Sequence, residues 1–568
     1  MKSLIQGTAS IWLGVWSLLT ALGWLLPNHQ RPWTSFHSDA WISATLIALL
    51  PFAVRMVPPR FALDRLSLTL LVVSLVPLAQ YAFGLIHFFG HAWICTLYIA
   101  GLLVAVLTGQ LWEGARPGQL VDTLCLAIGM AATLSVCLQI YQWLEFDGMG
   151  IWLIPSAPTR PSANLAQPNQ LATLLVWGAL AVLWGTIRSA LTAFTAIPLA
   201  MLLLFGTALT GSRTAWIAIA IIAGCAWLWK NVWTNKSTPL TITALGLYFF
   251  ACAAILSLLG TSGAENRLAS LVDNPSANRW SAWSLLLDAA FRQPLFGYGW
   301  GQVAEAHISV ALDYPALHSL FSQSHNIFLD LLVWCGIPIG VLFSVTLIRW
   351  IYRKVRSVSD EEGALFILFI LVLANHSLLE FPFQYAYFLL PAGLFIGCSI
   401  VRENRRSAVI RLGRWGITAL FTTVIVMFAV TISDYFRVER SYELLRMEWA
   451  GFNLEADPQP PHVTALTQWR EIISKARISP HANMSDDELS DLTNVTLLAH
   501  KPLDFMNLAD ALALNDRIGE ARRWIERLCK IESERNCLTA RDAFELRLNE
   551  IQALDSVITP PPSPPVSH

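Results

Sequence analysis

Long apolar runs constrain the fold of this chain more than any other feature. Runs of 18 or more largely apolar residues recur along the first 433 of its 568 residues, and a helix of that length crosses the hydrocarbon core of a bilayer. Thirteen candidate spans are centred near residues 18, 49, 75, 100, 131, 177, 200, 221, 250, 337, 372, 391 and 424. The sequence therefore predicts an all-α, polytopic membrane protein with about thirteen spans.

Charged residues separate this membrane part from a water-soluble part. Residues 434–568 hold 37 of the 77 Asp, Glu, Lys and Arg residues, so the end of the chain is expected to leave the bilayer. The net charge of −1 gives no reason to expect a nucleic-acid partner. We expect N-terminal membrane helices over 1–260, a large outside loop over 261–323, C-terminal membrane helices over 324–433, a helical soluble domain over 434–556 and a disordered Pro-rich tail over 557–568.

Basic residues set the expected orientation, because cytoplasmic loops are enriched in Lys and Arg. With the N-terminus in the cytoplasm, the inside loops hold Arg55, Arg60, Arg65, Arg116, Arg188, Lys230, Lys236, Arg349, Arg353, Lys354, Arg356, Arg402, Arg405, Arg406, Arg411 and Arg414. The outside loops hold only Arg31, Arg160, Arg213 and three arginines in the loop over 261–323. An odd number of spans then places the C-terminal domain outside.

The few arginines of the outside loops need a separate explanation. Charges at the membrane edge usually face a cavity or a partner, and the arginine fork bonds phosphate oxygens bidentately. Arg213 ends the tight turn of the segment LTGSRT, and Arg267, Arg279 and Arg292 lie in the long loop. Each is either an anchor of the structure or a ligand for an anion, and Arg267 and Arg292 are expected to be structural.

His325 and Asn326 stand at the start of the span centred near residue 337. A histidine titrates near neutral pH and can act as a general base, or it can cap the helix that follows. Asp330, one turn after Asn326, is expected to hydrogen-bond the Asn326 side chain. His307 and His318 in the preceding loop are expected to be solvated polar groups.

Several motifs in a fixed order resemble the O-antigen ligase/polymerase superfamily. They are Arg279-x3-Trp283, PLFGYG over 294–299, SHN over 324–326, GIP over 336–338 and the Gly-Ser-Arg turn that ends at Arg213. The stretches NLAQPNQLA over 164–172 and NHSLLEFP over 375–382, with the additional soluble domain, resemble the protein O-oligosaccharyltransferase branch (PglL type). Many relatives carry an acidic residue where this chain has Trp334-Cys335, so the role of that acid is lost or has moved to Asp330.

The resemblance implies a bacterial inner-membrane glycosyltransferase whose active site and C-terminal domain face the periplasm. It would transfer a whole oligosaccharide from a membrane-lipid carrier, undecaprenyl pyrophosphate, to Ser or Thr hydroxyls of a periplasmic protein such as pilin. Arg279 and Arg213 would stabilise charge on the leaving pyrophosphate. His325 would deprotonate the acceptor or bind the phosphate as imidazolium, and Asn326 would orient His325 or the substrate.

A single base and an anion clamp suffice for an inverting displacement. The sequence shows no convincing carboxylate pair for a retaining route and no cluster at metal-ligand spacing, so we expect no metal and no cofactor. Candidate substrate ligands are Gln167, Asn169 and Gln170 at the start of the sixth span, and Arg267. Gln167, Asn169 and Gln170 can equally cap the span. His376 and Glu380, four residues apart, are expected to form a local pair or to bind substrate.

The C-terminal domain contains one helical hairpin that resembles a tetratricopeptide unit, over 507–515 and 518–528. It could hold an acceptor protein or serve only in packing. Cys529 and Cys537 follow, eight residues apart. In one unbroken helix their Cα atoms would lie about 12 Å apart, too far to bond, whereas a turn between them would permit a disulfide in the periplasm. Both alternatives stay open.

Three other functions fit the same sequence. An O-antigen ligase would use the lipid A core as acceptor, and an O-antigen polymerase would use a sugar hydroxyl. A lipid-linked glycan transporter without chemistry would need polar residues through the midplane of the membrane, whereas the polar candidates gather on one face.

Overall fold

The structure, a computed structural model, describes residues 2–146, 148–153, 160–165, 167–259, 275–402, 410–452 and 458–558. Arg267, Arg405, Arg406 and the Pro-rich tail from residue 559 lie outside the described residues. The apolar helices are α1 (Lys2–Leu25), α2 (Phe36–Arg55), α3 (Arg65–Ala82), α4 (Phe89–Ala115), α5 (Gln119–Trp143), α6 (Pro168–Ile187), α7 (Ala193–Leu209), α8 (Arg213–Leu228), α9 (Thr238–Leu258), α13 (Ile327–Arg356), α14 (Glu361–Ser377), α15 (Ala386–Val401) and α16 (Arg414–Trp449).

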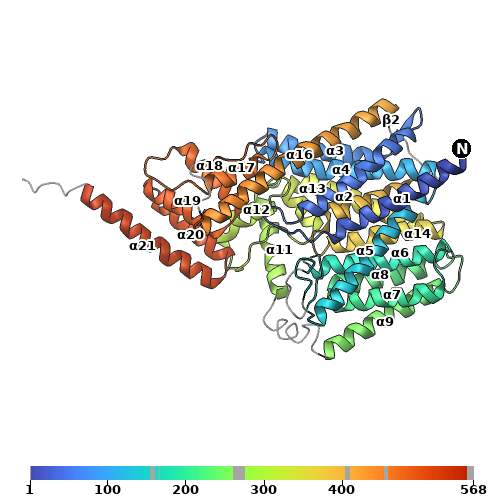
Figure 1. The fold of residues 1–568 in the computed structure, drawn as a ribbon. Coiled ribbons are helices and arrows are strands. Elements are labelled where there is room, and N and C mark those ends of the chain that lie inside the picture. The colour runs from blue at the N-terminus through green and yellow to red at the C-terminus, as the bar shows by residue number, and fades with distance from the viewer. Residues whose placement is uncertain are drawn as a thin grey trace, which may run out of the picture.

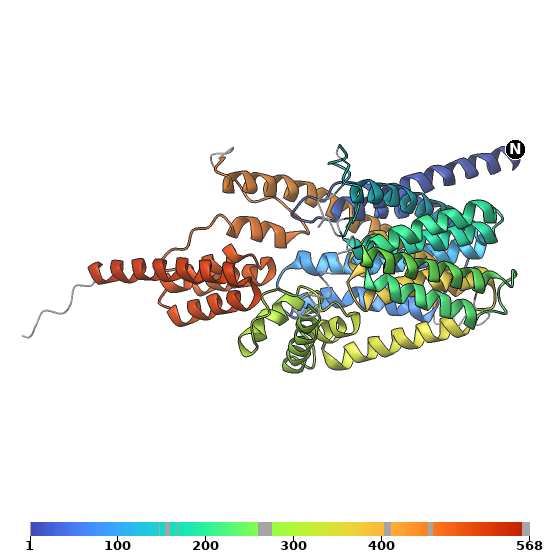
Figure 2. The same ribbon diagram turned by 90° about the horizontal axis from the view of Figure 1, so that it is seen from below.

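These helices confirm the all-α, polytopic membrane fold. Each of the thirteen predicted span centres falls inside one of them. Within the described ranges, eight helices are long and apolar enough to cross a membrane, and four shorter apolar helical segments accompany them. They run side by side through the same half of the molecule in both ribbon views (Figures 1 and 2).

Close contacts between glycines hold the centre of the bundle together. A Cβ atom added at Gly109 of α4 would lie 2.4 Å from the carbonyl oxygen of Leu394, and one added at Gly397 of α15 would lie 2.1 Å from that of Val106. The two helices therefore approach through their backbones, as small residues permit in membrane bundles. Beside this contact, the rings of Phe369 and Phe395 stack at 4.1 Å and join α14 to α15.

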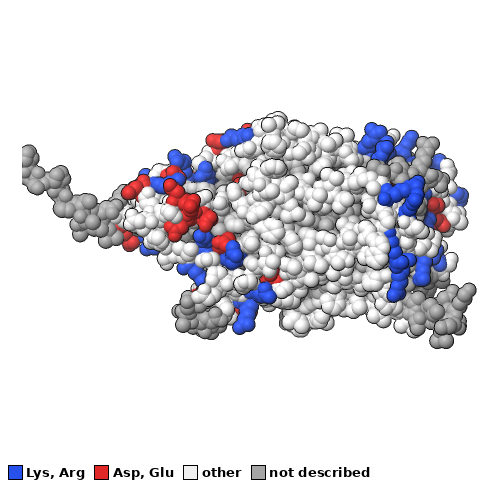
Figure 3. All heavy atoms as spheres, turned by 90° about the horizontal axis from the view of Figure 1, so that it is seen from above, with Lys and Arg blue, Asp and Glu red and all other residues white. Residues whose placement is uncertain are grey.

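One end of the bundle is fastened by ion pairs and a short sheet. Arg402 pairs with Glu113 and Glu362, and Arg188 pairs with Glu362 and Asp122. Strands β1 (Phe61–Leu63) and β2 (Ile410–Leu412) pair antiparallel, with Ala62 opposite Arg411. Loops that were predicted to share one side of the membrane therefore lie together. The space-filling view shows basic residues gathered at this end, an uncharged band beside them, and charges of both signs at the other end (Figure 3).

A second layer covers the other end of the bundle. It contains α11 (Pro275–Arg292), α12 (Val303–Val310), η1 (Ala311–Asp313) and the first turns of α13, which pack around Leu286, Ala289, Val303 and Val333. The span that was predicted to begin at the His-Asn segment contains a break at Gly336 of α13, where φ is 77° and ψ is 169°. The part after this break is about 30 Å long at 1.5 Å per residue, which is enough to cross the hydrocarbon core of a bilayer.

Two backbones cross at this break, and the crossing explains the glycines of two motifs. The amide of Tyr298 donates to the carbonyl of Val333 at 2.8 Å, and the amide of Ile337 donates to Pro294 at 2.7 Å. A Cβ at Gly297 would lie 2.4 Å from the Val333 oxygen, and one at Gly336 would lie 2.5 Å from the Leu295 backbone. Both glycines also have positive φ, which other residues rarely adopt.

The C-terminal helices pack onto the second layer. They are α17 (Thr467–Lys475), α18 (Asp486–Ala499), α19 (Pro502–Leu514), α20 (Ile518–Ile531) and α21 (Glu534–Ile558). Their core, which includes Phe505 and Trp524, also takes in Ile308 of α12. The Lys530 ammonium donates to the carbonyl of Tyr314 at 2.7 Å. Helix α16 runs without a break past residue 434 and joins this region to the bundle.

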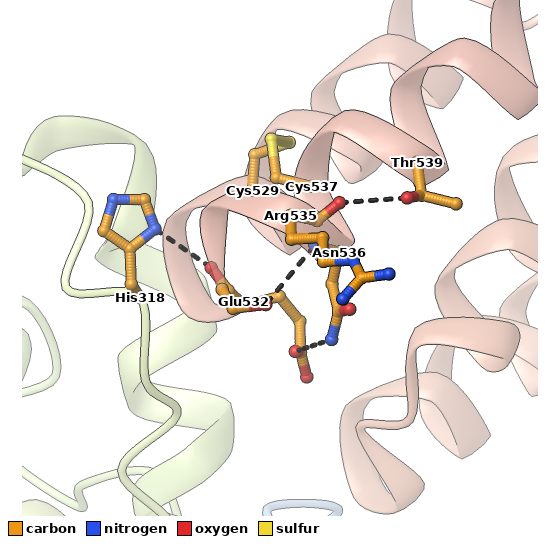
Figure 4. The surroundings of a disulfide bond; sticks show 8 residues. His318, Cys529, Glu532, Arg535, Asn536, Cys537 and Thr539 are labelled. Atoms are coloured by element: carbon orange, nitrogen blue, oxygen red, sulfur yellow. Dashed lines mark hydrogen bonds between the residues drawn. A yellow bond between two sulfur atoms is a disulfide. The ribbon is translucent and has the colours of Figure 1, made fainter.

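The two C-terminal cysteines form a disulfide in this structure (Figure 4). Helix α20 ends at Ile531 and α21 begins at Glu534, so a turn brings the two Cα atoms to 4.6 Å. The backbone carbonyl of Glu532 in this turn lies 3.0 Å from Nδ1 of His318. The bond therefore fixes the turn that contacts the loop before α13.

Replacing both Cys529 and Cys537 by serine is expected to lower the stability of the C-terminal helices. Closing a loop of this length removes denatured-state entropy worth roughly 2–3 kcal/mol. Thermal unfolding of the purified chain should show a lower Tm for the double variant than for the wild type. Digestion of the wild type without reductant should yield one linked peptide, and two free thiols would contradict the pairing.

Candidate active site

Glu380 is the centre of a polar cluster built from four segments of the chain. Its side chain is only 6 % exposed. Oε1 accepts hydrogen bonds from Nη2 of Arg279 at 2.9 Å and from Nδ2 of Asn169 at 3.0 Å. Oε2 lies 2.9 Å from Nδ1 of His325 and accepts from Nε2 of Gln167 at 3.4 Å. Four residues singled out from the sequence thus meet on one carboxylate.

Helix ends place each of these side chains. Arg279 lies in the first turns of α11, and His325 lies two residues before α13. Gln167 is the N-cap residue of α6, and Asn169 is in its first turn. Glu380 lies beyond the end of α14, where its amide donates to the carbonyl of His376 at 2.8 Å. The helices next to these four segments begin or end at the same face of the bundle, and the four segments therefore meet there.

The backbone at His325 has a left-handed conformation, with φ of 57°, which is uncommon for a residue with a side chain. Its neighbours hold it in place. The amide of Ser324 donates to Oδ1 of Asp330 at 2.9 Å, and the indole of Trp283 donates to the carbonyl of Ser324 at 2.7 Å. Strain that the surroundings maintain in this way is typical of functional sites, and here it turns the imidazole toward Glu380.

Charge determines the protonation of the cluster. Burial raises the pKa of Glu380, but the hydrogen bond and charge of His325 and the charge of Arg279 outweigh burial, so the pKa is lowered overall. Glu380 is therefore a carboxylate at neutral pH and can only accept hydrogen bonds. In neutral His325, Nδ1 then carries the proton and Nε2 is left as an acceptor. This arrangement suits a general base, with Glu380 as its positioning residue.

Arg213 lies beside this cluster, because Ser212, the residue before it, is joined to the cluster by a hydrogen bond. It is the first residue of α8 and is exposed, with no ion pair among the residues that the structure describes. Ser212 donates from its hydroxyl to Oδ1 of Asn169 at 2.7 Å, and Asn169 in turn bonds Glu380. The guanidinium is thus available to an anion beside the cluster.

Other candidates have structural contacts. Gln170 is buried and accepts from the Tyr387 hydroxyl at 2.8 Å, and Asn326 caps α13 by accepting from the amide of Phe328 at 3.1 Å. Nδ1 of His376 lies 2.8 Å from the Thr173 hydroxyl.

Two expectations from the sequence are wrong, and of a third only one alternative remains. Among the described residues, His376 and Glu380 have other side-chain hydrogen-bond partners and do not bond each other, and their binding of substrate stays a prediction. Asp330 bonds the amide of Ser324 rather than the Asn326 side chain. His307 is buried, with 1 % exposure, and its Nδ1 accepts from the amide of Phe321 at 3.1 Å. Burial lowers the pKa of His307 to about 4, so it is a neutral support for the segment that leads to His325.

The hydrogen bond between His325 and Glu380 is the main feature that sequence reasoning missed. Both residues were candidates, but in separate roles, and they are 55 positions apart. The sequence offered only a carboxylate just beyond an apolar helix, and its spacing from His376 suggested a different partner.

Comparisons with known proteins cover the segments that form this cluster. The family profile described as "O-Antigen ligase" matches residues 198–344, which include Arg213, Arg279 and His325. The profile "Protein glycosylation ligase" matches residues 161–184, which include Gln167 and Asn169. The profile "Virulence factor membrane-bound polymerase, C-terminal" matches residues 364–531, which include Glu380.

Two curated proteins of Acinetobacter baylyi are similar to this chain. A "General O-oligosaccharyltransferase" is 28% identical over 538 residues, which are 91% of this chain and 92% of that protein. A "ComP-specific O-oligosaccharyltransferase" is 25% identical over 342 residues, or 60% and 62% of the two chains. No solved structure matches. These matches confirm the resemblance drawn from the motifs: segments of this multi-pass membrane protein are similar to the O-antigen ligase and protein glycosylation ligase profiles, and most of the chain is similar to an O-oligosaccharyltransferase.

Proposed function

We propose that this protein transfers an oligosaccharide en bloc from undecaprenyl pyrophosphate to Ser or Thr hydroxyls of periplasmic proteins such as pilin. The cluster of His325, Glu380 and Arg279 carries the proposal, because it combines an oriented base with an anion-binding group at the end of a membrane bundle. The profile "Protein glycosylation ligase" supports protein as the acceptor class, and the names of the two relatives support transfer of an oligosaccharide.

The reaction we propose is a single displacement. The acceptor hydroxyl gives its proton to Nε2 of His325 while its oxygen forms a bond to the anomeric carbon. The bond between that carbon and the pyrophosphate oxygen breaks, and its electron pair stays on the pyrophosphate. Arg279 and Arg213 stabilise this charge as it develops. Attack opposite the leaving group inverts the anomeric carbon.

Arg279 can serve both Glu380 and the donor. It bonds Glu380 through Nη2, and a guanidinium has five N–H donors, so others remain for phosphate oxygens. Its side chain is 36% exposed, so the lipid-linked oligosaccharide can reach the guanidinium. We infer that Arg279 binds the pyrophosphate close to the reacting bond and that Arg213 binds it from α8.

The distribution of charge supports an orientation in the inner membrane. Basic residues gather at the end of the bundle that holds β1 and β2 (Figure 3), and such residues favour the cytoplasmic side. The cluster and helices α17–α21 belong to the other end, and we therefore place them in the periplasm. There the C-terminal helices would meet acceptor proteins.

An acceptor assay in cells that lack their own ligase tests the proposal. The cells supply a defined lipid-linked glycan and candidate acceptors, pilin included, and intact-protein mass spectrometry and a lipopolysaccharide gel follow the product. We expect glycan mass on protein. Glycan on lipopolysaccharide alone would instead assign the chain to the ligases that use lipid A core.

Replacing Arg213 by glutamine is expected to lower the transfer rate by about 10²–10³-fold, because one stabilising charge is lost from the transition state. The Tm should stay at the wild-type value, since Arg213 is exposed and has no ion pair in the described part of the chain. Lysine at this position should restore part of the rate.

The matched control is Arg292→Gln on the same side of the membrane. Arg292 is exposed and pairs with Asp288 and Asp313 at 2.8 and 2.7 Å, away from Glu380. Its variant should transfer glycan at close to the wild-type rate. Equal losses in the two variants would show that general charge, and not Arg213 itself, supports the reaction.

A further inference from the structure

A cavity of about 1260 Å³ lies between α3, α13 and the C-terminal helices. Its lining extends on α3 from Arg65 to Val73 and on α13 from Phe343 to Arg353. We name this part of the cavity the trench. Between its arginines the trench has mainly apolar walls, which consist of Leu66, Thr69, Leu70, Val73, Ile99, Leu102, Phe343, Leu347 and Trp350.

Three arginines line the end of the trench that lies farthest from the active-site cluster. Arg65 is the first residue of α3 and follows β1 by two residues, and Arg349 and Arg353 lie one turn apart near the end of α13. Helix α14, which follows α13, carries Glu362, which pairs with Arg402 at the same end of the bundle. Three positive charges therefore stand at the end where basic residues gather (Figure 3).

The guanidinium groups of these three arginines are available to an anion. All three residues are exposed, and none has an ion pair among the residues that the structure describes. Arg402 at the same end is instead paired with Glu113 and Glu362. The preference of basic residues for the cytoplasmic side explains the end at which the three arginines lie, but it does not place them on the wall of a cavity. Their planar N–H donors match phosphate oxygens.

Distance and apolar walls narrow the class of the anion. Arg353 follows the break at Gly336 by 17 residues, or about 25 Å of helix, and His325 lies on the other side of that break. A phosphate bound by the arginines is therefore too far from His325 to be the leaving group of the proposed reaction. The walls between these two levels are apolar and suit acyl chains, whereas a water-soluble phosphate compound would leave them uncovered. Trp350 lines the trench beside Arg349, and tryptophan is enriched at the level of lipid headgroups.

We propose that the trench binds an anionic phospholipid of the cytoplasmic leaflet, with its phosphate on Arg65, Arg349 and Arg353 and its acyl chains against the apolar walls. Basic pockets between membrane helices suit such headgroups, because charge-assisted hydrogen bonds add to the attraction of opposite charges. The inference goes beyond the proposed function, since no residue of the active-site cluster takes part. The bound lipid contacts α3 and α13 together and therefore stabilises the folded chain.

Thermal unfolding and native mass spectrometry of the delipidated full chain in neutral detergent test the site. The probes are phosphatidylglycerol, zwitterionic phosphatidylcholine and inorganic phosphate. We expect phosphatidylglycerol in large excess over its Kd to raise the Tm by about 3 °C or more and one molecule of it to stay bound. An equal rise with phosphatidylcholine would show a site for any lipid, and an equal rise with inorganic phosphate would show a site for a free anion. Either result would overturn the inference.

The double variant Arg349→Gln/Arg353→Gln is expected to bind phosphatidylglycerol about thirtyfold more weakly, as two basic residues near a membrane surface predict. Its Tm without lipid should equal that of the wild type, because both residues are exposed and have no ion pair in the described part of the chain. If that Tm falls, Arg65→Gln serves as the second variant, with an expected loss of about fivefold.

Arg356→Gln/Arg414→Gln is the matched control. Both residues are exposed at the same end of the bundle, as the last residue of α13 and the first of α16, and neither lines the cavity. This variant should bind phosphatidylglycerol as the wild type does. Equal losses in the two double variants would show general attraction by surface charge, and undiminished binding by Arg349→Gln/Arg353→Gln would remove the arginines from the site. Each of these outcomes would overturn the inference and leave the proposed function standing.

Discussion

Replacing His325 by alanine is expected to abolish detectable glycan transfer, with the rate falling by about 10²–10⁴-fold for loss of the general base. The imidazole is held by the hydrogen bond of Nδ1 with Glu380 at 2.9 Å, which leaves Nε2 to take the acceptor proton. A serine or threonine hydroxyl is a poor nucleophile without such a base. Within the described ranges, His325 is the only histidine whose ring hydrogen-bonds Glu380.

Single-turnover transfer and thermal unfolding, measured on the same variant, distinguish a loss of catalysis from a loss of folding. His325 is partly exposed, at 23%, so the alanine variant should keep a Tm close to that of the wild type. His318→Ala is the control, because His318 is exposed and Nδ1 of its ring lies 3.0 Å from the backbone carbonyl of Glu532 in the α20–α21 turn. Undiminished transfer by His325→Ala would remove His325 from the mechanism even though the resemblance to the family stands.

The pH dependence distinguishes a base from a phosphate ligand. A base must be neutral, so transfer should fall as the pH is lowered and imidazolium forms. A phosphate ligand must be charged, so transfer should instead fall as the pH rises. The geometry is arranged for the first outcome, because the hydrogen bond of Nδ1 with Glu380 leaves Nε2 as the ring atom that can take the acceptor proton.

The membrane helices could be predicted because hydropathy is a local property. All thirteen centres fall inside helices, including that of α13. The break in α13 could not be predicted in the same way. It depends on the crossing of Gly297 and Gly336, which are far apart in the sequence and meet at backbone distance.

The active-site cluster, like the fold, could be predicted only in part. Motifs singled out Arg279 and His325, and both contact one carboxylate. The role of Glu380 was not predicted, because a spacing of four residues suggested a pair with His376 on one helix face. Helix α14 ends at Ser377, so Glu380 lies beyond the last turn and its side chain contacts residues from α6, α11 and the segment before α13 instead.

Replacing Glu380 by glutamine is expected to lower the transfer rate by about 10²–10³-fold, as loss of a catalytic electrostatic contact does. The amide has nearly the same shape and can still accept from Arg279. Its NH₂ group would then face Nδ1 of His325 and donate to it, which moves the imidazole proton to Nε2. The base is lost although the hydrogen bond persists.

The same variant also predicts a change in acid stability. Because the pKa of Glu380 is lowered in the folded protein, its carboxylate contributes stability at neutral pH that is lost as the pH falls through the folded pKa. The Tm of Glu380→Gln should therefore depend less on pH in the acid range than that of the wild type. Thermal unfolding at several pH values measures this directly.

Glu361→Gln provides the matched control at the opposite end of α14. Glu361 bonds the hydroxyl of Thr234 at 2.9 Å and is the first residue of α14, whereas Glu380 lies beyond its last residue, Ser377, so its variant should transfer glycan normally. If Glu380→Gln also kept the wild-type rate, the carboxylate would not set the tautomer of His325. A large loss in Glu380→Gln alone would instead show that the reaction depends on the charge that joins base and anion-binding arginine.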